Sequence, residues 1–410
     1  MPTITHDTLP CGIEYAVMPL PGRRVVSFQL RILSGVSDEP PARLGLARLM
    51  SETIDKGTEV RSGRALADAF DAIGASHGLG VGCETTSASC TVLPEHFEQA
   101  LSLHAEFLRR STFDKSAFET AVVLARQELL ALDDDAQALA DKIISRRAFG
   151  PVLGRHSLGE AETLERIRRE DLVAHWQSTF TAGRMLAVVG GDIEPKRAAD
   201  ALQAQFEGFG PPQRGGRDPF AVSYTPGLAH TEKELAQQQI SICWPGVEAL
   251  HDDFPPQQVM LGILSGGMSG RLFTEVREKL GLVYWVSAWQ ETPRGSGMIF
   301  LGASTTPARC DETFEVLLKE VDRLEHDIQA DELERAVTGI TAQRATRGDT
   351  TRARVAELAG DLFFFGRPVP ESEKIRRVKA VTIEKIRDYL QRCPRDSYCA
   401  VTLGPKAPTR

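Results

Sequence analysis

The segment Gly45–Thr58 contains polar residues whose spacing would place them together on one face of a helix, where they could act in chemistry. The segment reads Gly-Leu-Ala-Arg-Leu-Met-Ser-Glu-Thr-Ile-Asp-Lys-Gly-Thr. Arg48 and Glu52 are four residues apart, so on a helix their side chains are neighbours that can form a salt bridge. Ser51 precedes Glu52, but its hydroxyl cannot serve as the base that activates a water molecule. The pattern therefore predicts an ion pair.

Histidine and cysteine, the side chains that most often bind transition metals, are scattered along the chain. The nine histidines are His6, His77, His96, His104, His156, His175, His230, His251 and His326. None is three to five residues from another, the spacing that brings two imidazoles of one helix to one ion. The seven cysteines include no C-x-x-C pair, so we expect reduced and mostly buried thiols.

A second segment, Ser265–Ser287, combines a glycine-rich start with charged and aromatic residues. Its glycines lack the Lys-Ser/Thr of a phosphate-binding loop, which favours a turn at the beginning of a helix. Arg277 and Tyr284 follow, seven residues apart. By residue type alone, they are a surface arginine and a part-buried tyrosine near the end of a helix.

The elements that must position these residues follow one order twice along the chain. The first set comprises strands at 13–18 and 24–33, a helix at 44–54, a strand at 87–93, a helix at 94–110 and a strand at 184–191. Its counterparts are a strand at 238–244, a helix at 270–280, a strand at 298–304, a helix at 308–327 and a strand at 397–404. This order predicts an α+β fold of two similar halves, each a mostly antiparallel sheet packed by helices on one face.

A stretch rich in glycine and proline separates the two sets. Residues 207–219 cannot propagate a helix or a strand, which favours a linker. The predicted organisation is an N-terminal domain at 1–206, a linker at 207–222 and a C-terminal domain at 223–410.

Composition limits the classes of function. The net charge is -8 and the pI is about 5.7, whereas a nucleic-acid-binding protein would show a basic surface. The N-terminus lacks the basic and apolar runs of a secretory signal, and no stretch approaches the roughly 20 apolar residues of a membrane helix. The expected location is the cytoplasm.

The segment Gly45–Thr58 resembles the zinc helix of the pitrilysin (insulinase) family, which includes the mitochondrial processing peptidases and their bacterial relatives. Active members carry H-x-x-E-H there, where two histidines bind zinc and the glutamate activates water. In this sequence Arg48 replaces the first histidine, Ser51 the glutamate and Glu52 the second histidine. Only Glu128 matches the family's more distant third ligand. The resemblance therefore implies no metal and no other cofactor in this chain.

The segment Ser265–Ser287 resembles the family's G-x-M-x-S-R-L-F-x-x-V-R-E-x-x-G-L-x-Y-x-V. Weaker resemblances at 149–162 and 180–192 extend the match over nearly the whole chain. In the family, the arginine and tyrosine bind the substrate backbone near the scissile carbonyl, and these roles fall here on Arg277 and Tyr284. Both side chains can donate hydrogen bonds to a carbonyl or to the oxyanion that develops from it.

Bacterial members of the family often build one active site from two chains of this size. The resemblance implies that this chain is the substrate-binding subunit, inactive alone, of a heterodimeric metallopeptidase whose partner carries the zinc and the catalytic glutamate. One alternative is a structural subunit like the core proteins of the respiratory bc1 complex. Another is a homodimer that binds peptides without cutting them. The sequence names neither the peptide nor the partner.

Overall fold

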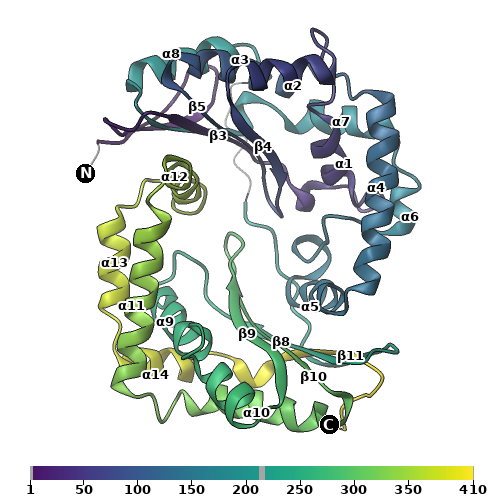
Figure 1. The fold of residues 1–410 in the computed structure, drawn as a ribbon, viewed down its shortest axis with the longest axis vertical. Helices are drawn as coiled ribbons and strands as arrows, with labels where there is room; N and C mark the ends of the chain where they lie inside the picture. Colours follow the sequence, from purple (N-terminus) through teal and green to yellow (C-terminus); the bar gives the residue numbers. More distant parts are fainter. Residues whose placement is uncertain (1–2, 212–217, 410) are drawn as a thin grey trace. The chain divides into compact units, whose positions relative to one another are not determined.

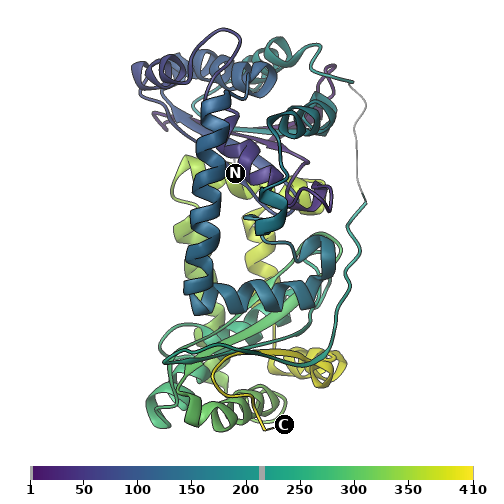
Figure 2. The same ribbon diagram turned by 90° about the vertical axis from the view of Figure 1, so that its right-hand side faces the viewer.

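The computed structural model describes residues 3–211 and 218–409 and divides into two compact units, each with one β-sheet (Figure 1, Figure 2). The first unit comprises Met1–Leu130, His156–Asp218 and Arg347–Val369. The second comprises Ala131–Arg155, Pro219–Thr346 and Pro370–Arg410. Each unit thus includes a segment from the other half of the sequence, unlike the contiguous domains 1–206 and 223–410. Residues 212–217 of the expected linker lie outside the described residues.

The sheet of the first unit has six strands in the order β1-β2-β6-β3-β5-β4. The strands are β1 (Thr5–Thr8), β2 (Glu14–Pro19), β3 (Val26–Ile32), β4 (Ser76–Val81), β5 (Thr86–Val92) and β6 (Met185–Gly191). β2 and β6 are parallel, and the other neighbouring pairs are antiparallel. The last strand therefore lies between the two earlier strands β2 and β3.

The sheet of the second unit has five strands in the order β7-β11-β8-β10-β9. The strands are β7 (Gly227–Glu232), β8 (Gln238–Pro245), β9 (Val283–Glu291), β10 (Met298–Thr305) and β11 (Cys399–Gly404). β7 and β11 are parallel, and the other pairs are antiparallel. The pattern repeats that of β2, β6, β3, β5 and β4, so the predicted fold of two similar, mostly antiparallel halves is confirmed.

The helices of each unit cover mainly one face of its sheet (Figure 1). In the first unit they are α1 (Leu46–Thr53), α2 (Gly63–Ala72), α3 (Phe97–Arg110), α4 (Lys115–Asp134), α6 (Ala161–Leu164), α7 (Arg169–Thr179) and α8 (Pro195–Phe206). In the second they are α9 (Phe254–Ser265), η4 (Leu272–Lys279), α10 (Cys310–Arg323), α11 (Ala330–Arg347), α13 (Glu371–Lys379) and α14 (Ile383–Arg392). Short 3₁₀ turns are η1 (Val36–Asp38), η2 (Pro94–His96), η3 (Ala182–Arg184), η5 (Pro307–Arg309) and η6 (Arg395–Ser397).

Two further helices, α5 (Ala136–Leu153) and α12 (Thr351–Phe365), belong to the unit of the other half of the sequence. Leu358 and Leu362 of α12 pack in one buried cluster with Met18 and Val188 of the first sheet. Phe149 of α5 likewise packs in one buried cluster with residues of the second sheet. Each sheet is therefore covered by one helix on its second face, beyond the one-sided cover expected. This second layer explains why β6 is apolar and buried along its whole length.

Element order corrects one pairing inferred from the sequence. We matched the helix at 44–54 with the helix at 270–280, but the counterpart of α1 is α9, and η4 corresponds to α2. Both α1 and η4 follow a turn with glycine, and this shared signal misled the comparison. In the described part of the chain, no helix has the length and apolarity needed to cross a membrane.

Candidate functional site

Helix α1 is held at its N-terminus by a buried carboxylate and a close packing contact. Glu39 is 3% exposed, and its oxygens accept hydrogen bonds from the backbone N–H groups of Gly45 (3.1 Å) and Ala47 (2.7 Å). A carboxylate there satisfies amides that lack partners within the helix and interacts favourably with the helix dipole. Gly45 has φ 98°, and a Cβ atom on it would lie 2.8 Å from the side chain of Leu164. The helix therefore has a fixed start just before Arg48.

Arg48 links carboxylates on two helices. Its Nη2 atom is 3.1 Å from Oε1 of Glu52 on α1 and 3.4 Å from both carboxylate oxygens of Glu128 on α4. The hydroxyl of Ser51 donates to the backbone carbonyl of Arg48 at 2.8 Å, which occupies it within the helix. The structure thus brings Arg48, Glu52 and Glu128 together, with Ser51 beside them, and the expected salt bridge is present.

This arrangement does not fit a zinc ion. A guanidinium keeps its proton and would repel a dication at the place where a histidine ligand is needed. Within residues 3–211 and 218–409, no group of three or more His, Cys, Asp or Glu side chains could hold a metal. The carboxylates are 47% exposed and Arg48 is 33% exposed. Ion pairs at such exposure contribute about 0–1 kcal/mol to stability, so the cluster is a surface group of ion pairs that adds little to the fold.

Arg277 lies on the π-helix η4. The N–H of Leu280 is bonded to the carbonyl of Glu275, five residues earlier, at 3.3 Å. Helices of this type are rare and are frequent at functional sites. Leu272 and Val276 bury the inner face of η4 in the core of the unit, which leaves Arg277 exposed. Its Cζ atom is 5.0 Å from the ring centroid of Phe273, within the range of a cation–π interaction.

Tyr284 stands at a β-bulge near the start of β9. Val283 pairs with Thr305 and Trp285 with Ser304, so Tyr284 has no partner on β10. A bulge re-aims a side chain out of the regular alternation of a strand. Tyr284 is 75% exposed, which corrects the part-buried side chain expected from its residue type. Its ring centroid is 5.6 Å from Cζ of Arg277, so the two predicted residues lie together.

The Arg277–Tyr284 pair offers unused hydrogen-bond donors. Among the described residues, neither the guanidinium nor the phenol has a hydrogen-bond or ion-pair partner. β9 is the last strand of its sheet, so the backbone groups on its outer side have no strand partner in the part of the chain that the structure describes. The guanidinium presents a planar fork and the phenol a single O–H. Together with a free strand edge, they can bind the carbonyls of an extended peptide.

Sequence reasoning missed Phe273 and the bulge. The four-residue spacing of Phe273 and Arg277 on a predicted helix was a signal for the ring contact. No residue pattern marked the bulge, because it depends on how β9 pairs with β10.

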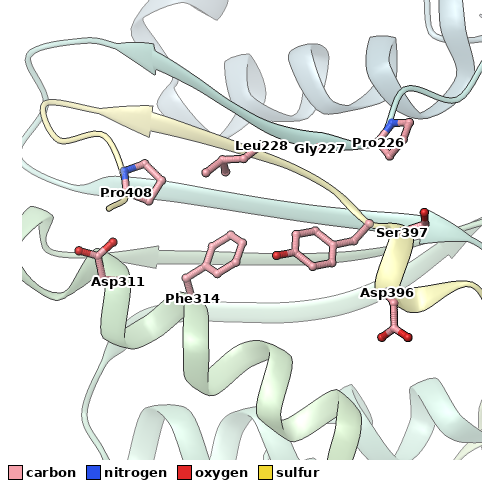
Figure 3. A pocket seen from close by; sticks show the side chains of 9 residues that line it. Pro226, Gly227, Leu228, Asp311, Phe314, Asp396, Ser397 and Pro408 are labelled. Carbon is pink, nitrogen blue, oxygen red and sulfur yellow. The ribbon is translucent and has the colours of Figure 1, made fainter. Parts of the chain in front are cut away.

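A cavity of about 360 Å³ lies in the second unit. Its walls come from the start of β7, the start of α10 and the turn before β11, with Phe314, Leu228 and Pro408 among them (Figure 3). Neither Arg277 nor Tyr284 lines it, so we assign it no part in the site.

Two family models match the chain. The model for insulinase (peptidase family M16) matches residues 16–160, and the model for the peptidase M16 inactive domain matches residues 166–340. The first range includes the Arg48 group, and the second includes Arg277 and Tyr284.

Similar proteins extend over the full length of the chain. An uncharacterized zinc protease of Bacillus subtilis, YmxG, is 24% identical over 98% of both chains, and one of Rickettsia bellii is 23% identical over 96% of both. The crystal structure of a peptidase M16 inactive domain from Pseudomonas fluorescens superposes with a TM-score of 0.88 at 20% identity, covering 100% of this chain and 99% of the other. A protease from Helicobacter pylori also has a TM-score of 0.88, at 13% identity over 98% and 100%. These structures share the fold.

Proposed function

Because the chain belongs to peptidase family M16, the insulinase family, we propose that it is the metal-free, substrate-binding subunit of a two-chain peptidase. A homologous partner with an intact H-x-x-E-H helix supplies the zinc ion and the catalytic glutamate. This chain supplies Arg277 and Tyr284, which hold the peptide backbone.

One observation carries the proposal: the two groups of family positions have opposite states. At α1 the positions of the ligands and the base are filled by a guanidinium that pairs with the carboxylates of Glu52 and Glu128, and by a hydroxyl that donates to a backbone carbonyl. At η4 and β9 the arginine and tyrosine have no polar partners among the described residues and reach solvent. A chain that had lost all function would have no need to keep exposed donors free beside an open strand edge.

The chemistry of the pair sets the kind of substrate. A peptide that adds as a strand beside β9 presents its carbonyls in a row along the strand edge. Near the bulge, one carbonyl can accept from the guanidinium and the phenol. Donors held there also favour the negative oxygen that develops during hydrolysis. Such pairing needs a free backbone, so we expect unfolded or short peptides as substrates.

The test is reconstitution. The isolated chain should neither bind zinc nor cleave an unfolded fluorogenic peptide, while an equimolar mixture with the M16 subunit from the same genome that carries H-x-x-E-H should cleave it. A partner that is fully active alone, and unchanged by addition of this chain, would contradict the proposal. That outcome would favour a scaffolding role.

A further inference from the structure

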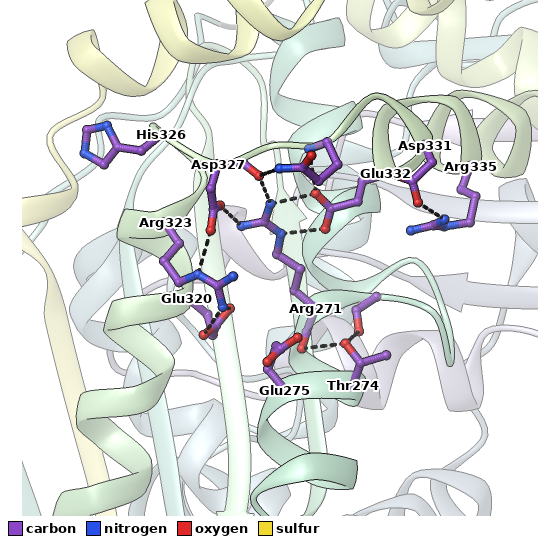
Figure 4. Close-up of polar contacts among 12 residues, drawn as sticks. Arg271, Thr274, Glu275, Glu320, Arg323, His326, Asp327, Asp331, Glu332 and Arg335 are labelled. Carbon is purple, nitrogen blue, oxygen red and sulfur yellow. Dashed lines mark hydrogen bonds and ion pairs between the residues drawn. The ribbon is translucent and has the colours of Figure 1, made fainter.

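The segment that carries Arg277, which is η4 with the turn after it, is anchored at both ends by arginines of its own unit. The first anchor is Arg271, directly before η4 (Figure 4). Its side chain is 6% exposed. The guanidinium donates to both carboxylate oxygens of Glu332, at 2.7 and 2.6 Å, and to Oδ1 of Asp327 at 2.6 Å. It also reaches the backbone carbonyl of Asp327 at 3.1 Å.

The partners of Arg271 are themselves held in place. Asp327 accepts a second bond from Arg323 of α10 at 2.8 Å, and Glu332 accepts one from the backbone N–H of Gln329 at 2.9 Å. Burial raises the pKa of Asp327 and Glu332, but the hydrogen bonds from the guanidinium groups outweigh it and hold the pKa of each carboxyl below its ordinary value. Both carboxylates are therefore charged at neutral pH, and the start of η4 is fixed to the connection between α10 and α11.

The second anchor is Arg309, directly before α10. Its Nη1 atom donates to the carbonyl of Gly281 at 2.7 Å, and its Nη2 atom donates to that of Leu280 at 3.1 Å. These carbonyls end η4, where the chain turns towards β9, and a basic side chain is a common partner for the last carbonyls of a helix. Arg309 precedes α10, and the partners of Arg271 follow it. Helix α10 thus connects the two anchors.

From this geometry we propose that Arg271 and Arg309 are positioning residues, which hold η4 and the turn after it against α10 and so set the placement of Arg277 relative to Tyr284. This inference rests on the proposed function of that pair. Buried ion pairs add little net stability compared with apolar packing, but they fix one geometry when fully hydrogen-bonded. A lysine at either position would keep the charge and lose the planar fork.

The placement can be measured without any substrate. The chain has five tyrosines, so ¹⁹F NMR of protein labelled with 3-fluorotyrosine gives few signals, and Tyr284→Phe identifies the relevant one. We expect Arg271→Lys and Arg309→Lys to shift or broaden the Tyr284 signal. The matched control is Arg395→Lys: Arg395 is 16% exposed and bonds to Asp322, Glu325 and the carbonyl of Leu390, none of them in 270–284. If Arg271→Lys does not fold, Glu332→Gln tests the same anchor. An unchanged Tyr284 signal in both anchor variants overturns the inference.

A double-mutant cycle tests the functional consequence. With a fluorescein-labelled peptide from unfolded casein as the probe, each anchor variant should weaken binding about tenfold, or ~1.4 kcal/mol. The loss should vanish in an Arg277→Ala background, because the anchors act through Arg277. A loss of equal size in both backgrounds indicates a merely structural role and overturns the inference. If Arg277→Ala itself leaves binding unchanged while the Tyr284 signal still moves, the proposed function fails and the positioning geometry stands.

Discussion

The α1 group and the η4–β9 pair both contain an arginine in reach of other functional side chains, yet their arginines are used in opposite ways. The Nη2 atom of Arg48 is 3.1 Å from the carboxylate of Glu52 and 3.4 Å from that of Glu128, so this arm of the guanidinium is used in ion pairs. Arg277 lies over the rings of Phe273 and Tyr284 and has no ion-pair partner among the described residues. A ring face orients a guanidinium without using its N–H groups. Residue type alone therefore does not distinguish the two groups; the partners of each arginine do.

The largest effect should be on peptide turnover, after removal of the Arg277–Tyr284 pair. In the reconstituted complex, Arg277→Ala combined with Tyr284→Phe should lower peptide turnover by about 10²–10³-fold, the usual consequence of losing donors to a developing oxyanion. The steady-state rate on a fluorogenic peptide measures it. Lys279→Ala is the control, since Lys279 is on the same helix and pairs with Glu275. Equal rates for the double variant and the parent would show that Arg277 and Tyr284 do not contribute to turnover.

The second-largest effect should be on stability, through helix α12, which packs on the first sheet although it comes from the second half of the sequence. Leu362 of α12 is 2% exposed against the first sheet, and Leu362→Ala should lower the free energy of unfolding by about 3 kcal/mol. Leu130→Ala is the matched control, because Leu130 is 69% exposed and should change stability by less than about 0.5 kcal/mol. Urea denaturation measures both. Equal midpoints would show that α12 does not stabilise the unit that holds Arg48.

Restoring the missing chemistry at α1 would sharpen the comparison. The triple variant Arg48→His, Ser51→Glu and Glu52→His should bind one zinc ion per chain, since Glu128 already lies beside these positions. Adding Glu128→Gln should weaken that affinity at least about tenfold, because a direct ligand matters no less than the groups around it. Titration with a competing zinc dye reports both values. A triple variant without zinc affinity would mean that the backbone at α1 no longer has the geometry of a metal site.

Acid should weaken the contacts of Arg271, because it protonates the carboxylates that hold the start of η4. Asp327 and Glu332 have pKa values below their ordinary 3.8 and 4.5, so their contribution to stability is complete above those values and is lost as pH falls through the lower folded-state values. The fluorine signal of Tyr284 should stay constant from about pH 6.5 to pH 5 and change only below about pH 4. A change centred near neutral pH would point to a different titrating group.

The smallest effect should come from the α1 ion pairs. Arg48→Met should change the free energy of unfolding by about 0–1 kcal/mol and leave peptide turnover within about twofold of the parent, because exposed pairs contribute little. Chemical denaturation and the turnover assay are the measurements. A large loss of turnover would mean that Arg48 contacts the substrate or the partner, contrary to its assignment to a local group of ion pairs.

Local pattern was enough to predict most elements but not their assignment to units. The strands at β3, β5 and β10 and the helices α1 and α3 follow from period and from glycine at a helix start. The apolar residues of α5 and α12 do not recur at a clear helical period, and the sheet that each helix covers is distant in sequence, so no local signal assigns either helix to its unit. The same limit applies to the site. The resemblance to the family's motifs singled out Arg48, Glu128, Arg277 and Tyr284, whereas the bulge and the anchors depend on pairing between distant residues.

Peptide binding by the isolated chain tests the central claim most directly. Fluorescence anisotropy with a labelled unfolded peptide, recorded with and without a chelator, separates binding by donors from binding by a metal. The account predicts that the chain alone binds the peptide, that the chelator leaves the Kd unchanged, and that Arg277→Ala weakens it. Binding that the chelator abolishes, or that Arg277→Ala leaves untouched, would contradict it.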